Sequence, residues 1–399
     1  MKLSPNVPRW AEDFLTEAKL KVDWGNAAFI TLSPIAAIVG VIWYLTRHGI
    51  HPMEIAVFGV YYWATGIAIT AGYHRLYAHR TYKCNRVVEV FYALFGAASC
   101  ENSILRWARD HRVHHQLVDT DKDPYSIIKG FLWAHMGWIY FKKTSDDEDF
   151  SKVPDLTKNT IVMWQERYKL PITIIMAFGI PTFLGLLIGR PFGGFLWGGL
   201  LRVVIVHHQT FCINSLAHLW GSRPYNGQAS ARDSWWLALI TYGEGYHNFH
   251  HEFAGDYRNG HRWYQFDPGK WWINGLRGLG LVSTVSRYRD EQILRAKIKN
   301  DVEQVKRQMA RMPEGLAPAL ERRIHATRER LEASAKRWED ARRQYREIKS
   351  SAIAESQRTR ARWAASIREH RAELDAALAR WRVLIAASTR LADRTPISG

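Results

Sequence analysis

The stretch Trp107-Ala-Arg-Asp-His-Arg-Val-His-His115 places histidines at positions 111, 114 and 115. On an α-helix, residues i, i+3 and i+4 lie on one face, so these imidazoles can point towards one place. The segment Gly243-Glu-Gly-Tyr-His-Asn-Phe-His-His251 repeats the spacing at positions 247, 250 and 251. His74 and His79 form a third cluster, and His218 closes the stretch Asn214-Ser-Leu-Ala-His218.

These nine histidines predict a metal centre. Neutral imidazole is the commonest metal ligand and suits iron, zinc and copper. One ion rarely needs more than about four to six protein ligands, so nine indicate two ions. His74 and His79 are about 140° apart on an ideal helix, so we expect the helix to end or loosen there. A lone histidine is usually a satisfied core residue, but repeated clusters in a chain with 17 histidines favour a metal.

Four apolar segments predict transmembrane helices. They cover about residues 27–45, 53–73, 172–189 and 195–214, and about 20 apolar residues cross a bilayer. Short turns join them into two hairpins. The basic segments before, between and after the hairpins lie on one side, which the positive-inside rule makes cytosolic. Both termini and all the histidine clusters are therefore expected on the cytosolic side.

Polar residues interrupt the fourth segment. Arg202, His207 and His208 are costly in lipid and are expected to face the protein interior. His207 either lines a cavity near the metals or bonds a neighbouring helix. The stretches Val87–Cys100 and Ile127–Tyr140 are apolar but too short to span, so we expect them at the membrane interface.

Composition divides the chain into an N-terminal arm (1–26), a membrane domain (27–288) and a basic tail (289–399). The formal charge of +17 implies a negatively charged partner, and the tail lacks a recognised nucleic-acid-binding module. Ile324, Leu331 and Trp338 recur every seven residues, which is typical of a coiled coil. This stripe indicates self-association, packing within the chain or contact with an anionic membrane.

From about residue 27 to 288 the chain resembles the membrane fatty-acid desaturases, specifically the acyl-CoA Δ9 (stearoyl-CoA) branch in its bacterial form. The matching runs are the three stretches quoted above and Ile69-Thr-Ala-Gly-Tyr-His-Arg-Leu-Tyr-Ala-His-Arg80. The resemblance implies an all-α fold with two transmembrane hairpins under a cytosolic helical cap. It also implies that the cap holds two iron ions (Fe2+/Fe3+), with O2 as cosubstrate.

The resemblance assigns roles to individual residues, with no catalytic side chain beyond the metal centre. The implied iron ligands, with Asn214 acting through a water molecule, are His74, His79, His111, His114, His115, His218, His247, His250 and His251. The implied contacts to acyl-CoA are Asn102, Trp107, Arg109, Asp110 and Lys129. Glu101 departs from the pattern, because an uncharged residue like glutamine is expected at that position.

The implied reaction introduces a cis double bond, at Δ9, into a saturated long-chain acyl-CoA and produces water. Removing hydrogen from an unactivated methylene requires a strong oxidant, because no acid or base has a suitable pKa. The sequence has no haem, flavin or iron–sulfur motif. Electrons are therefore expected from a separate ferredoxin, rubredoxin or cytochrome b5 with its reductase. The absence of a fused donor and of a retention signal favours the bacterial inner membrane over the endoplasmic reticulum.

Other readings share these motifs. A membrane hydroxylase or an acyl-lipid desaturase would use the same histidines, and a metal-binding scaffold would make the tail the working part.

Phe58, Tyr61 and Tyr62 on the second span either form the floor of a substrate channel or are lipid-facing or core aromatics. Four acidic residues can orient the imidazoles by accepting their second N–H. They are Asp110, Asp121, Asp123 and Glu244.

Overall fold

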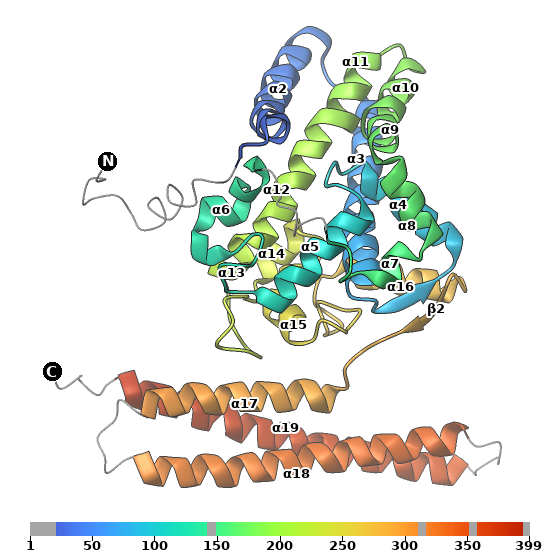
Figure 1. Cartoon of the computed structure of the whole chain (residues 1–399). Coiled ribbons are helices and arrows are strands. Elements are labelled where there is room, and N and C mark those ends of the chain that lie inside the picture. Colours follow the sequence, from blue (N-terminus) through green and yellow to red (C-terminus); the bar gives the residue numbers. More distant parts are fainter. Residues whose placement is uncertain (1–20, 142–148, 310–316, 351–356, 394–399) are drawn as a thin grey trace, which may run out of the picture. The chain divides into compact units, whose positions relative to one another are not determined.

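The computed structural model describes residues 21–141, 149–309, 317–350 and 357–393, and the chain divides into two compact units (Figure 1). The first unit contains the described residues up to Arg223 and from Gln228 to Arg287. The second contains Pro224–Gly227 and the described residues from Tyr288 onward. Most of the expected N-terminal arm, residues 1–20, lies outside the described residues.

The first unit is mostly helical, as predicted. In chain order its helices are α2 (Trp24–His48), α3 (Pro52–Ile67), η1 (Ala68–Ala78), α4 (Arg86–Ala97), α5 (Ile104–Leu117), η2 (Ile127–Lys129), α6 (Phe131–His135), η3 (Gly137–Tyr140), α7 (Pro154–Thr157), α8 (Thr160–Arg167), α9 (Lys169–Ile174), η5 (Ile175–Gly179), α10 (Ile180–Leu186), α11 (Pro191–Gly194), η6 (Phe195–Leu201), α12 (Arg202–Asn214), α13 (Leu216–Leu219), α14 (Trp235–Ile240), α15 (His247–Glu252) and α16 (Pro268–Gly278). Two short strands that were not predicted, β1 (Tyr82–Cys84) and β2 (Val282–Val285), pair antiparallel.

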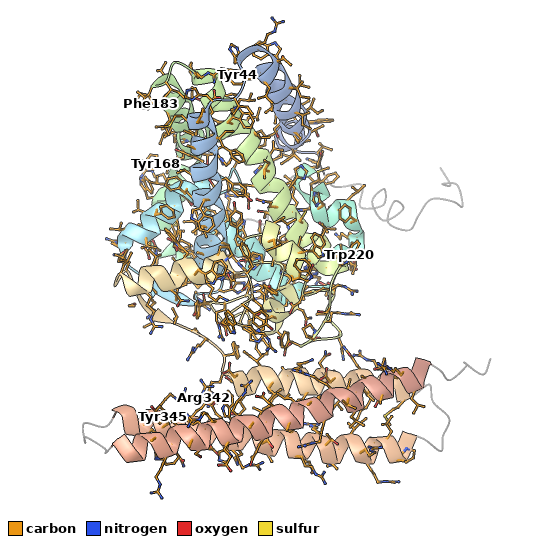
Figure 2. The ribbon with its side chains drawn as sticks, turned by 180° about the vertical axis from the view of Figure 1, so that it is seen from behind. Tyr44, Tyr168, Phe183, Trp220, Arg342 and Tyr345 are labelled. Carbon is orange, nitrogen blue, oxygen red and sulfur yellow. The ribbon has the colours of Figure 1, made fainter. Side chains whose placement is uncertain are left out.

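Three helical segments among the described residues are long and apolar enough to cross a membrane. They are Trp24–His48, Pro52–Ala78 and Lys169–Leu186, and they coincide with three of the four predicted spans. Helix α2 exposes apolar side chains, with Ile38 and Val39 each 60% exposed, which is typical of a lipid-facing helix. Tyr168, Phe183 and Trp220 are further exposed aromatic residues (Figure 2).

The fourth predicted segment forms a continuous helical run, α11–η6–α12. Because it contains polar residues, it is not among the three segments that are apolar enough to cross a membrane. Arg202 is fully buried and donates to the backbone carbonyls of Gly198, Ala98 and Ala177. The predicted interior orientation of Arg202 is thus confirmed. These carbonyls satisfy a guanidinium that lipid would leave unpaired.

A core of buried apolar and aromatic residues is formed mainly by η1, α4, α5, α7, α8 and α16 together with both strands. Tyr73, Tyr92 and Ile104 are fully buried in this core. Ser103 directly precedes helix α5, and its side chain accepts the N–H of Arg106 and so caps the first turn. This packing fixes η1, α4 and α5 against one another and sets the position of the histidines that η1 and α5 carry.

The second unit contains three helices, α17 (Asp290–Met309), α18 (Ala317–Ser350) and α19 (Gln357–Asp393). The predicted stripe Ile324, Leu331 and Trp338 packs into one core with residues of α17 and α19 such as Val305 and Trp381. The guanidinium carbon of Arg342, a residue labelled in Figure 2, lies 4.6 Å from the ring centroid of Trp338. Packing within the chain therefore accounts for this stripe.

Candidate metal centre

Helix η1 brings the first histidine cluster together. It is a π-helix, in which the N–H of His79 donates to the carbonyl of His74 at 3.0 Å. A π-helix is wider than an α-helix, so residues five apart come onto nearly the same face. The His74 and His79 rings lie 4.8 Å apart, centroid to centroid. The prediction that the helix loosens at this cluster is confirmed.

Helices α5 and α15 supply three histidines each in a matching pattern. His111 and His115 of α5 face one place, while His114 is about 100° from His115 around the helix and faces another. On α15, His247 and His251 form the pair and His250 is the histidine that diverges. In each helix residues i and i+4 thus serve one group and residue i+3 serves the other, so the prediction that all three histidines of a helix point towards one place is wrong.

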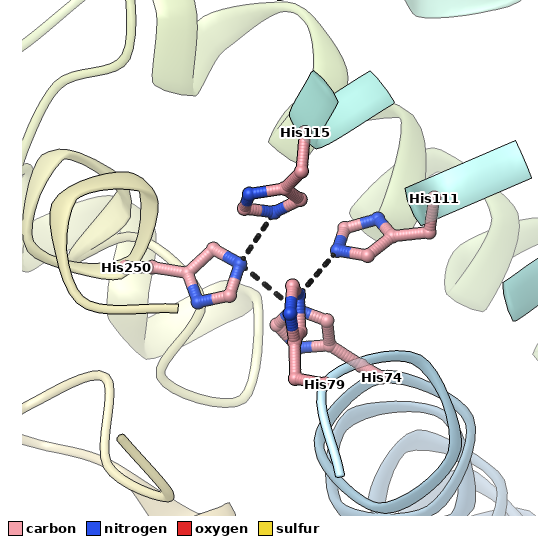
Figure 3. A group of neighbouring side chains, drawn as sticks. All are labelled: His74, His79, His111, His115 and His250. Carbon is pink, nitrogen blue, oxygen red and sulfur yellow. Dashed lines mark hydrogen bonds between the residues drawn. The ribbon is translucent and has the colours of Figure 1, made fainter. Parts of the chain in front are cut away.

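The histidines therefore gather into two groups, within each of which the ligand nitrogens all lie within 4.8 Å of one another. The first group, drawn in Figure 3, contains His74, His79, His111, His115 and His250. The second group contains His114, His218, His247 and His251. Sequence reasoning named all nine residues, but it did not divide them between two groups.

The donor set of both groups fits a metal ion. In the first group the Nε2 atoms of His79 and His111 lie 2.8 Å apart, and those of His74 and His250 lie 3.0 Å apart. Burial lowers the pKa of His111 and His250 well below its usual value, and the neighbouring imidazoles lower it further. The rings are therefore neutral and offer lone pairs, which is the form that binds a metal.

Side chains behind the imidazoles fix the ring orientation. The Nδ1 of His74 lies 3.0 Å from Glu244, and the Nδ1 of His114 lies 2.9 Å from Asp123. These contacts make Nδ1 the protonated nitrogen and leave Nε2 free for a metal. The other two acidic residues that were expected to orient imidazoles are Asp110 and Asp121. Asp110 forms an ion pair with Arg109 at 3.0 Å, and Asp121 is exposed.

Arg75 supports the same carboxylate, a role that sequence reasoning missed. Its buried guanidinium lies 3.0 Å from Glu244 and 2.9 Å from Asp267, and it donates to the carbonyl of Tyr257 at 2.9 Å. Burial alone would raise the pKa of Glu244, but His74 and Arg75 lower it to about 2. The position of Arg75 directly after His74 was the only available signal.

A cavity of about 730 Å³ opens against both histidine groups. His74, His111 and His247 contribute to its wall, and so does Asn214. Of the five expected acyl-CoA contacts, three also line it, namely Asn102, Trp107 and Asp110. The other two lie outside the lining: Arg109 is buried and paired with Asp110, and the ammonium of Lys129 lies 4.9 Å from the ring of Trp133.

The cavity wall also contains residues that the sequence did not single out. Arg106 and Lys169 line it, and both pair with Glu166 at 3.0 Å.

His207 lines it too, and its Nε2 lies 2.7 Å from the carbonyl oxygen of Ser99. Of the two roles that the sequence left open, His207 thus lines the cavity, and its hydrogen bond is to the turn that follows α4 and not to a helix. His208 instead contacts His135, with 3.1 Å between ring nitrogens.

Glu101 is a partly buried acid in this wall. Trp107 donates to one carboxylate oxygen at 3.2 Å, and Thr210 donates to the other at 2.9 Å. Burial raises the pKa of Glu101 to about 7, despite the opposing hydrogen bonds from Thr210 and Trp107. The carboxyl group therefore titrates near neutral pH.

Phe58, Tyr61 and Tyr62 lie outside the cavity lining. Gln209, which lines the cavity, donates its side-chain amide to the hydroxyl of Tyr62. Tyr242 also lines the cavity and donates to the backbone carbonyl of Tyr62 at 2.9 Å. Tyr62 thus stands directly behind one part of the cavity wall.

The fold and this site define a helical membrane protein with two groups of metal-type ligands beside a cavity. The fatty acid desaturase family model matches residues 53–282. The probable acyl-CoA desaturase of Schizosaccharomyces pombe is 43% identical over 74% of this chain and 61% of its own length. This chain belongs to the fatty acid desaturase family.

Two more relatives extend the comparison. Acyl-CoA desaturase 1 of Saccharomyces cerevisiae is 37% identical over 73% of this chain and 57% of its own length. Delta(9)-fatty-acid desaturase fat-7 of Caenorhabditis elegans is 33% identical over 69% of this chain and 83% of its own length. The chain thus spans about three fifths of the two yeast relatives. All three relatives are eukaryotic and give no support to the expected bacterial form.

Proposed function

We propose that this protein is an acyl-CoA desaturase that introduces a cis double bond, at Δ9, into a saturated long-chain acyl-CoA. The observation that carries the proposal is the convergence of nine histidines into two groups, three of whose members, His74, His111 and His247, line one cavity. The names of the relatives, acyl-CoA desaturase and Delta(9)-fatty-acid desaturase, support the substrate class and the position.

The nine histidines would hold two iron ions, and Asn214 would reach one of them through a water molecule. When bound, iron supplies the O2-dependent oxidising power that an unactivated methylene requires. The protein's own part is to hold the imidazoles neutral and oriented through Glu244, Asp123 and Arg75. A protein ligand set made only of nitrogen also distinguishes this site from carboxylate-bridged di-iron bundles.

The cavity would hold the acyl chain and exclude water from the reacting carbons. Its lining includes apolar and aromatic side chains such as Ile69, Phe178 and Val206. A methylene chain has no polar handle, so its position depends on the shape of the wall and on contacts at its headgroup end. We assign headgroup contacts to Asn102, Trp107 and Asp110, with Arg109 and Lys129 contributing positive charge.

The membrane topology that we propose has four spans, with the helical run Pro191–Asn214 as the fourth. The carbonyl partners of Arg202 support it, because they satisfy the charge inside the protein. Both termini and the histidine groups would then face the cytosol. The eukaryotic origin of the relatives favours the membrane of the endoplasmic reticulum over the bacterial inner membrane.

Electrons would come from a separate ferredoxin, rubredoxin or cytochrome b5 type donor with its reductase. The net charge of +17 favours an acidic donor, because complementary charge speeds encounter. Purified protein supplied with reduced donor, O2 and either labelled stearoyl-CoA or a labelled phospholipid tests the substrate class. Oleoyl-CoA should form from the thioester. Conversion of the phospholipid alone would make the protein an acyl-lipid desaturase.

Replacing Tyr62 by alanine is expected to lengthen the acyl chains that the protein accepts. Loss of the ring behind Gln209 and Tyr242 opens space at that part of the wall. The ratio of turnover on 20-carbon to 18-carbon acyl-CoA measures the effect and should rise severalfold. Trp63→Ala removes a neighbouring, 44% exposed ring and serves as the control. An unchanged ratio in Tyr62→Ala would show that this ring does not limit the channel.

Replacing Glu101 by glutamine is expected to flatten the pH dependence of kcat/KM for acyl-CoA. Because the pKa of Glu101 is about 7, the carboxyl group is mainly neutral at pH 6 and mainly ionised at pH 8. An apolar chain enters more easily beside the neutral form. Wild-type kcat/KM should therefore fall by up to about tenfold over this range, whereas Glu101→Gln should stay level. Parallel profiles for the two proteins would refute this role.

A further inference from the structure

His218 is the one candidate ligand that stands outside the three clusters. It lies on α13, a helix of four residues, and its Nε2 faces the Nε2 of His247 at 3.1 Å. So short a helix fixes a side chain poorly by itself. Another contact must therefore hold this ring in the orientation that the second histidine group requires.

That contact comes from Ser230, twelve residues further along the chain. Its Oγ lies 2.6 Å from the Nδ1 of His218. When Nδ1 carries the proton and donates a hydrogen bond to this hydroxyl, Nε2 keeps its lone pair directed at the second group. Ser230 thus occupies the place behind His218 that Glu244 and Asp123 occupy behind His74 and His114.

Asp119 in turn holds Ser230 in place. One of its carboxylate oxygens, Oδ2, accepts the backbone N–H of Ser230 at 2.8 Å. Asp119 has a φ of 62°, in the left-handed region that residues other than glycine seldom adopt. Such a conformation persists only where surrounding contacts fix it, and it is common near functional sites.

We propose that Ser230, held by Asp119, is a positioning residue that fixes the tautomer and orientation of His218. It thereby sets how tightly the second histidine group retains its metal ion. The inference rests on the proposed two-metal function and adds to it two residues outside the ligand set.

The test is iron retention in the full chain, which needs neither acyl-CoA nor an electron donor. Ser230→Ala should bind one of its two irons about 10- to 100-fold more weakly than the wild type in competition with a chelator, the usual effect of removing a partner behind a ligand. Ser230→Thr should restore retention, because it keeps the hydroxyl. Ser222→Ala is the matched control, since that hydroxyl in the same loop bonds only weakly, at 3.4 Å, to the carbonyl of Asp233.

Variants of Asp119 separate its hydrogen bond from its backbone conformation. Asp119→Asn keeps an oxygen acceptor and tolerates the left-handed region, so it should retain iron like the wild type. Asp119→Gly relieves the backbone but removes the acceptor, so it should lose iron as Ser230→Ala does. Equal retention in Ser230→Ala and Ser222→Ala would overturn the positioning role. A wild type that binds no metal would overturn the two-metal centre itself.

Discussion

Replacing His250 or His218 by alanine is expected to release one iron from the protein and to abolish desaturation. His250 belongs to the first histidine group and His218 to the second, so each substitution would remove a nitrogen from a different one of the two proposed ions. Loss of a partner behind a ligand costs about 10- to 100-fold in metal affinity or activity, and loss of the ligand should cost more. We therefore expect activity to fall more than about a hundredfold.

Iron per chain and Mössbauer spectra of the purified variants measure this effect. Each variant should keep about one iron, and the remaining spectra should differ because the surviving groups have different ligand sets. His325→Ala is the matched control, because His325 is an exposed histidine of α18 and lies in neither group. Two irons in His250→Ala would remove it from the ligand set.

Replacing Arg75 by alanine is expected to destabilise the first unit strongly. The side chains of Glu244 and Asp267 are at most 5% exposed and would lose their guanidinium partner. Breaking a buried ion pair by removing one partner costs about 3–5 kcal/mol. Thermal unfolding in detergent should shift down accordingly. Arg277→Ala, at an exposed position of α16, is the control.

The pH dependence of stability gives a second reading of the same contact. The pKa of Glu244 is lowered from 4.5 to about 2 in the folded protein. Its charged form therefore adds stability above about pH 4.5, and this contribution disappears as the pH falls towards 2. Arg75→Ala should shrink this acid-dependent part. Variants Arg75→Ala and Arg277→Ala that unfold alike at every pH would contradict the role of Arg75.

Local spacing was enough to predict which histidines gather as candidate ligands. His111, His114 and His115 fall on a single helix, and the wider turn at His74 and His79 follows from their spacing of five. The division into two groups could not be predicted, because it depends on how α5, α15 and η1 pack in space. Only the packed structure shows that His114 joins His218 while its neighbour His115 joins His250.

The residues behind the ligands were harder to anticipate than the ligands. Glu244 and Asp123 were candidates because an acid near a histidine cluster is a visible signal. Arg75 and Ser230 carry no such signal, and they act through contacts with residues 169 and 12 positions away. In the tail, the seven-residue stripe predicted helix packing, but its partners in α17 and α19 emerged only from the fold.

The most direct test of the desaturase assignment is fatty-acid methyl-ester analysis of cells that express the wild type or His114→Ala together with a competent electron donor. We predict a new cis-Δ9 monoene in wild-type cells and none in cells with His114→Ala, because His114 belongs to the second histidine group. A monoene that persists in His114→Ala would contradict the metal centre. A hydroxy acid in place of the monoene would contradict the desaturase and make the protein a hydroxylase.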